Sequence, residues 1–167
     1  SLASNYSSTA TVDDGSCCYD SLAIWSMSNS YTFDKSATVA MNNSGDIVAV
    51  GFPKYNNGSG TYSGTVQVFQ INSNGQWIQI GSDIDGDNSD DYFGHSVDLS
   101  ADGNVLIIGA KRFDVPSWQW PPIYDAGLVR VYANISGAWI QIGNDLTGNH
   151  ESENLGLSVS ISDDGSK

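Results

Sequence analysis

The fold is decided by WIQIGSDIDGDNSDDYFGHSVDLSADGNVLIIG, residues 77–109, because parts of this stretch recur along the chain. WIQIG returns at residues 139–143, and SVDLSADG returns as SVSISDDG at residues 158–165, both 62 residues later. TVAMNNSGDIVAVG, residues 38–51, aligns with SVDLSADGNVLIIG at an offset of 58 residues. This spacing indicates a supersecondary unit of about 60 residues that buries its faces against neighbouring copies.

Each unit is predicted to contain four strands. In the first unit these cover residues 38–41, 46–51, 64–70 and 76–80, and in the second unit residues 96–100, 104–109, 127–133 and 138–142. The second strand is a continuous apolar run (IVAVG, VLIIG), which predicts burial on both faces. The third and fourth strands alternate (VQVF, VRVY, WIQI), which predicts one exposed face. Because Trp77 and Trp139 occupy the same repeat position, we expect both to pack between units.

Four-stranded antiparallel units of this length predict an all-β fold of β-propeller-type blades. The boundaries place one blade at residues 36–95, a second at 96–157 and the first strand of a third at 158–167. The chain thus holds about two and a quarter repeats, whereas a closed propeller needs at least about four blades. We expect closure within a longer polypeptide, closure with other copies, or an open array.

The same region resembles the FG-GAP repeats of integrin-α-type propellers. Phe93-Gly94 lies where that family has its FG pair, Ile108-Gly109-Ala110 where it has GAP, and the GLVRVY segment from Gly127 where it has GxVxVY. The first copy departs from the pattern, with Ser36 in place of the motif's glycine and Gly51-Phe-Pro in place of GAP. The DxDxDG calcium cage of calcium-binding members is absent between the first two strands, so the resemblance does not carry that calcium site over.

The first 35 residues depart from the repeat. Residues 1–20 contain both cysteines, Cys17 and Cys18, and resemble the NYxxxATxDDGSC modules found in tandem in secreted proteins of marine bacteria and algae. In that family another cysteine usually precedes the module, so this stretch resembles a partial module whose disulfide partners lie elsewhere. An ordinary Asp-Gly turn is the alternative. Residues 21–35 are interpreted as a linker or an irregular entry strand.

Composition favours an extracellular protein. There are 19 acidic and 6 basic residues, for a net charge of -13, which excludes nucleic acid as a partner because phosphates would be repelled. The hydrophobic share of 40% argues against disorder, and no apolar run approaches the roughly 20 residues of a membrane span. Four sequons are compatible with secretion and glycosylation, at Asn5, Asn42, Asn57 and Asn134.

An acidic loop connects the two units and is a candidate calcium site. Five carboxylates within nine residues supply the oxygen ligands that calcium prefers, at Asp83, Asp85, Asp87, Asp90 and Asp91. Three of them become Thr147, Asn149 and Ser152 in the next copy, so such a site would not be repeated. The alternative is a solvated acidic surface loop.

An aromatic loop in the second unit is the candidate for partner binding. Its rings are those of Phe113, Trp118, Trp120 and Tyr124, in a connection five residues longer than its counterpart. Tryptophan and tyrosine are common anchors at interfaces and can also stack on sugar faces. In a propeller this connection and the acidic loop emerge on the same face of the blades. The alternative is that the loop folds back and hides its rings.

The sequence offers little for catalysis, because His95 and His150 form no metal-binding spacing and no GxSxG elbow is present. We therefore expect a non-catalytic adhesion or recognition module of a larger secreted or surface protein, binding a protein or glycan partner through loops on one blade face. The alternative is a structural building block of an extracellular filament or sheath, assembled from copies of the chain by blade packing or strand exchange. A carbohydrate-binding or hydrolytic propeller fragment is a third hypothesis.

Overall fold

The computed structural model describes residues 36–115 and 122–167, which fold into β-strands. The first sheet has the order β1 (Thr38–Met41), β2 (Ile47–Phe52), β3 (Thr65–Ile71) and β4 (Trp77–Gln79), with β5 (Ile84–Asp85) also pairing with β3. The second sheet has the order β6 (Phe93–Leu99), β7 (Val105–Ala110), β8 (Leu128–Ile135) and β9 (Ala138–Thr147). All these pairings are antiparallel. The described residues include no helix long and apolar enough to cross a membrane.

The predicted all-β class and the four strands of each unit are confirmed, with differences at the strand ends. β6 begins at Phe93 because a bulge at Gly94 and His95 lets the strand continue past the expected start. β9 runs on to Thr147, whereas its counterpart in the first sheet is broken into β4 and β5. Residues 158–167, where the first strand of a third unit was predicted, contain no strand in the structure.

Burial follows a strand's place in the sheet more closely than the alternation of its residues. All six residues of β2 are buried or nearly so, as the apolar run predicts. The expected alternation in β3 is wrong, because Thr65, Val66, Gln67 and Val68 are all buried in this interior strand. β9 is an edge strand and is exposed along almost its whole length. Thr65 and Gln67 are therefore buried because β3 lies in the interior of the sheet, although their side chains are polar.

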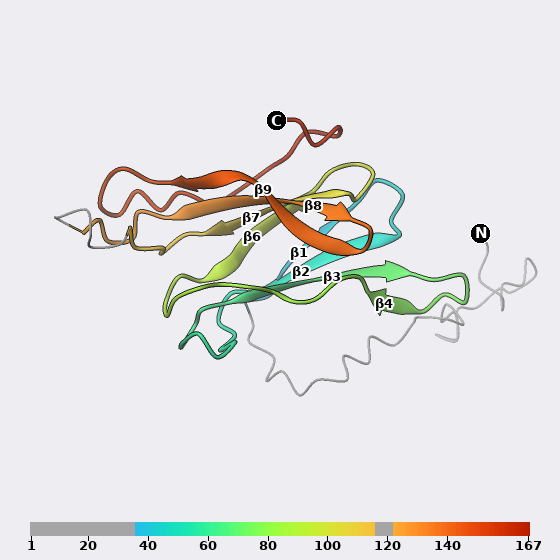
Figure 1. Ribbon diagram of the computed structural model, residues 1–167, viewed down its shortest axis with the longest axis horizontal. Helices are drawn as coiled ribbons and strands as arrows, with labels where there is room; N and C mark the ends of the chain where they lie inside the picture. Colours follow the sequence, from blue (N-terminus) through green and yellow to red (C-terminus); the bar gives the residue numbers. More distant parts are fainter. Residues whose placement is uncertain (1–35, 116–121) are drawn as a thin grey trace, which may run out of the picture.

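The two sheets stack on each other around one shared core. β6 packs against β1 and β2 (Figure 1). Phe93, Leu106, Ile108 and Leu128 of the second sheet are at most 2% exposed. They form one cluster with side chains of the first sheet, among them Ile47, Ala49, Val66, Val68 and Ile84. Burying this apolar surface is the main driving force that joins the two repeats.

The repeat is preserved in the contacts between units. Thr38 Oγ1 donates to Gly94 O at 2.7 Å, and 58 residues later Ser96 Oγ donates to Gly156 O at 2.8 Å. The glycine turns recur as well, with positive φ at Gly45, Gly103 and Gly165, which occupy the same repeat position. Residues 155–165 therefore contact the second sheet as the start of the second unit contacts the first.

Candidate functional site

Four connections meet at one end of the two sheets, on the left of Figure 1, and we call this surface the loop end. It comprises residues 53–64, 86–92, 111–115 with 122–127, and 148–155. Backbone hydrogen bonds join successive connections: Asp90 N to Thr61 O, Tyr92 N to Tyr62 O, Arg112 N to Asp91 O, and Ser152 N to Tyr124 O. The prediction that the acidic and aromatic loops emerge on the same face is therefore confirmed for their described parts.

Two tyrosines and two basic side chains form a cluster at the loop end. The rings of Tyr62 and Tyr92 lie 5.6 Å apart between centroids, and Tyr62 is 39% exposed. The Arg112 guanidinium lies 5.4 Å from the Tyr92 ring centroid, and the Lys111 ammonium lies 5.9 Å from it. Arg112 Nε also donates to Asp125 at 2.9 Å. Cation–π contact and the ion pair thus fix the position of Arg112 on the Tyr92 ring.

Both tyrosines adopt a backbone conformation that disfavours bulky side chains. Tyr62 has a φ of 54° and Tyr92 a φ of 58°, in the left-handed region where Asn and Asp are enriched. The second repeat has Asp125 and Asn154 at these two positions, with φ of 49° and 55°. The loop geometry is therefore common to both repeats, but only the first presents aromatic rings there, at a cost of about 1 to 2 kcal/mol per residue. Aligning the two repeats shows this difference, which motif searching missed.

A buried carboxyl precedes Tyr92 in the chain. Asp91 is 4% exposed, and Asn88 Nδ2 donates to its Oδ2 at 3.1 Å. Burial raises the pKa of Asp91 to about 6, against the opposing effect of the Asn88 hydrogen bond. The carboxyl therefore changes its charge in mildly acidic solution.

The carboxylates of the acidic loop do not converge on one point. Asp83 Oδ1 accepts from the side chains of Gln67 and Gln79 at 2.9 and 2.7 Å, whereas Asp87 pairs with Arg130 at 2.7 Å. Asp85 and Asp90 are exposed, and Asp91 is buried. No three His, Cys, Asp or Glu side chains within residues 36–115 and 122–167 are placed to hold a metal ion. Asp83, Asp87 and Asp91 thus serve separate hydrogen bonds or ion pairs instead of a shared cation site.

The aromatic loop is only partly described. Phe113 is 7% exposed and belongs to the core cluster, so it packs as the alternative interpretation predicts. Tyr124 is 54% exposed at the loop end, as a binding residue requires. Trp118 and Trp120 lie outside the described residues. Of the predicted binding aromatics that are described, Tyr124 alone is therefore available to a partner.

Arg130 joins the acidic loop to the second sheet, a role that was not predicted from the sequence. Its guanidinium makes two hydrogen bonds of 2.8 Å to the carboxylate of Asp145 and a 2.7 Å ion pair with Asp87. The side chain is only 13% exposed. The hydrogen bond to Asp145 is the largest cause of the raised pKa of Arg130, and the pairing with Asp87 adds to it. The same hydrogen bond lowers the pKa of Asp145. The loop is thereby fixed to the sheet behind it.

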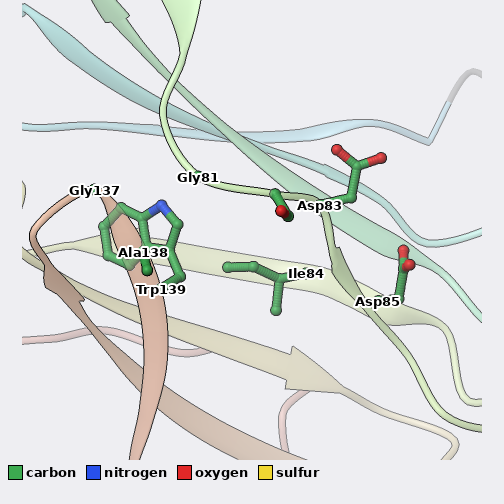
Figure 2. Close-up of a pocket in the computed structure, with 8 residues that line it drawn as sticks. Gly81, Asp83, Ile84, Asp85, Gly137, Ala138 and Trp139 are labelled. Carbon is green, nitrogen blue, oxygen red and sulfur yellow. The ribbon is translucent and has the colours of Figure 1, made fainter.

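A cavity of about 380 Å³ opens between the two sheets, away from the loop end. Figure 2 shows Ile84 pointing towards the Trp139 ring, whereas the carboxylates of Asp83 and Asp85 point away from it. Trp139 Nε1 donates to Ile80 O at 3.1 Å, and a Cβ added to Gly81 would lie 2.9 Å from the indole. The prediction that both tryptophans of the repeat pack between units is confirmed for Trp139, whereas Trp77 is half-buried in β4 and is not part of the shared core cluster. The cavity is the space around this tryptophan, and its acidic groups do not face inwards.

Two of the sequons are used internally. Asn42 is 6% exposed, and its Nδ2 donates to Ser44 and Asp46. Asn57 Nδ2 donates to Gly64 O and Gly86 O. A glycan would replace one of the two N–H donors of the amide nitrogen, so glycosylation at Asn42 or Asn57 would remove at least one of these hydrogen bonds. Asn134 is half-buried, whereas Asn5, Cys17 and Cys18 lie outside the described residues.

Comparison with known proteins gives no family for the chain. No family model matches the sequence, and no curated protein matches it either. The resemblances to FG-GAP repeats and to the NYxxxATxDDGSC module therefore remain predictions that rest on the quoted residues.

Proposed function

We propose that the chain is a non-catalytic recognition module of an extracellular protein, which binds a protein partner through the loop end. The observation that carries this proposal is the Tyr62–Tyr92–Arg112 cluster. Tyrosine and arginine are the residues that most often carry binding energy at protein interfaces. The first repeat places bulky tyrosines in a left-handed backbone conformation, whereas the second repeat places Asp and Asn there, which tolerate it. The extra strain of the tyrosines is a reason to look for a role of their rings in binding.

The charge of the molecule favours a basic partner. Asp87, Asp90, Asp114 and Glu151 are exposed at the loop end, and the net charge of the chain is -13. Complementary charge speeds encounter and selects partners, while buried aromatic contacts supply most of the affinity. We expect a partner surface that presents Lys or Arg around an apolar or aromatic contact for Tyr62, Tyr92 and Tyr124.

The scaffold of this module is a set of propeller-type blades. Support comes from the order of the strands in each sheet, from the face-to-face stacking of the sheets, and from the recurrence of the same contacts between units. Such stacking fixes loops from successive units at one end. Loops on a rigid scaffold are common binding surfaces.

The test uses a variant that exchanges the two tyrosines for the residues of the second repeat, Tyr62→Asp with Tyr92→Asn. Because Asp and Asn tolerate the left-handed region, this variant should fold at least as stably as the wild type. The control, Ser73→Asp, adds the same charge in the turn at the opposite end. Each chain is used to select from a displayed random-peptide library and is applied to a glycan array.

The wild type and the control should enrich peptides rich in Lys and Arg, and the double variant should lose at least about tenfold in affinity for them, the equivalent of about 1.4 kcal/mol. Equal enrichment by all three chains would show that the tyrosines do not bind. Binding to glycans with no enrichment of peptides would reject a protein partner in favour of a carbohydrate.

A further inference from the structure

The face of the second sheet that points away from the first sheet is apolar and is exposed along its edge strand β9, whereas Val129 in β8 is only 6% exposed. Antiparallel pairing places Ile107, Val131 and Ile142 in one row across β7, β8 and β9, and Val129 with Leu146 in the next row. Leu146 is 56% exposed and Ile142 is 41% exposed. We call these five residues the outer face. Apolar side chains grouped in this way on a sheet indicate a docking surface.

The same positions in the first sheet are buried between the two units. Ala49 corresponds to Ile107, Val68 to Val131 and Ile84 to Leu146. All three belong to the shared core, with exposures of 0%, 1% and 8%. The outer face of the second sheet therefore corresponds to the face of the first sheet that the second sheet covers.

A socket for a tryptophan is repeated along with the face. In the first unit, Gly81 ends WIQIG with a φ of 77° and has the indole of Trp139 against it. In the second unit, Gly143 ends the same motif with a φ of 75°, and a Cβ added there would meet nothing within 4 Å. The second sheet thus has the glycine of this contact without the tryptophan.

The end of the described chain already follows the course of a third unit on this side of the sheet, where Figure 1 shows it in red beyond β9. Ala101 N donates to Asp163 O at 2.9 Å, as Asn43 N donates to Ala101 O at 3.1 Å between the first two units. Gly127 pairs with Leu155 in the same parallel bridge that joins Gly64 to Phe93. These contacts lie on the β6 side of the sheet and leave the edge strand β9 exposed.

We infer that the outer face binds a third four-stranded unit of the same repeat, on the same polypeptide as residues 155–167. Its second to fourth strands would cover β8 and β9, and its tryptophan would lie against Gly143. Residues 155–167 fix the register of such a unit, which favours this occupant over a second copy of the chain. The inference concerns a surface separate from the loop end and is independent of the proposed function.

The test extends the full chain after Lys167 with a second copy of residues 106–157, which keeps the 62-residue register. Hydrogen exchange of residues 138–147 is then compared with and without the extension. The matched control carries the same extension with its copy of Trp139 changed to Ala. Sedimentation of the unextended chain measures self-association in parallel.

The extension should slow exchange of the exposed β9 amides by about tenfold or more, since covering an edge strand lowers its local opening. The Trp→Ala control should lose most of this protection. Ile142→Asp should destabilise the extended chain and leave the unextended chain nearly unchanged. Equal exchange in all chains would refute the inference. A dimer of the unextended chain that Ile142→Asp dissociates would also refute it, because a second copy would then be the occupant.

Discussion

Replacing Arg130 with Gln should weaken the second unit by a predictable amount. Gln is the residue that the first repeat has at this position, as Gln67, whose amide donates to Asp83 at 2.9 Å. The variant therefore keeps a hydrogen bond to Asp145 of the kind already present in the molecule. It loses the charge, the second hydrogen bond and the ion pair with Asp87.

The magnitude follows from the exposure of the partners. Arg130 is 13% exposed, so its bidentate bond to Asp145 should contribute about 2 to 3 kcal/mol. Asp87 is 58% exposed, so its ion pair should add less than about 1 kcal/mol. The neutral hydrogen bond that Gln retains offsets about 1 kcal/mol. We expect the free energy of unfolding of Arg130→Gln to fall by about 1 to 3 kcal/mol at pH 7.

The dependence on pH identifies the cause. The Arg130 hydrogen bond lowers the pKa of Asp145 in the folded protein. The stabilisation is therefore fully present above the pKa of an Asp in the unfolded chain, about 3.9, and is lost as the pH falls through the lower pKa of Asp145 in the folded protein. The deficit of the variant should therefore shrink below about pH 4, and it should also shrink in high salt. Urea denaturation across this pH range measures it. A deficit below about 0.5 kcal/mol at pH 7, or one that does not change with pH, would refute the reasoning.

Three further predictions concern single positions, each measured by urea denaturation. Burial raises the pKa of Asp91 to about 6, so the charged form of this carboxyl opposes folding. Asp91→Asn should therefore stabilise the protein by roughly 1 to 3 kcal/mol above pH 6 and have little effect below pH 4. The same effect at both pH values would contradict this cause. Trp139→Ala should lower the free energy of unfolding by about 2 to 3 kcal/mol, because the half-buried indole contacts both sheets. A loss below about 1 kcal/mol would mean that the packing of the sheets does not depend on this side chain. Gly94→Ala should cost about 2 to 4 kcal/mol, because its φ is 81° and a Cβ would lie 2.8 Å from Val66; Gly75→Ala is the control, since it shares a positive φ but has open space around it.

The candidate site was only partly predictable. The aromatic loop and the acidic loop were found because their composition is unusual, and the loop end indeed brings their described parts together. The grouping of five aspartates in sequence suggested a shared cation, but strand direction and the positions of Gln67 and Arg130 separate their side chains. Tyr62 and Tyr92 were missed because nothing in their local sequence is unusual. Their distinctive feature is a left-handed backbone, which the repeat alignment alone could have indicated.

The repeat length, the all-β class and the four strands of each unit could be predicted from the sequence. These features depend on local causes: apolar periodicity, glycines that accept positive φ, and motifs that recur at fixed spacing. The tertiary structure alone decided which carboxylates meet, that Asn42 is buried, and that Leu146 is exposed where Ile84 is covered. These depend on which sheet lies over which side chain, and residues of the same repeat position can differ in this respect. The identical WIQIG segments therefore form a strand in both units, but the length of that strand and the environment of each side chain depend on the neighbouring unit.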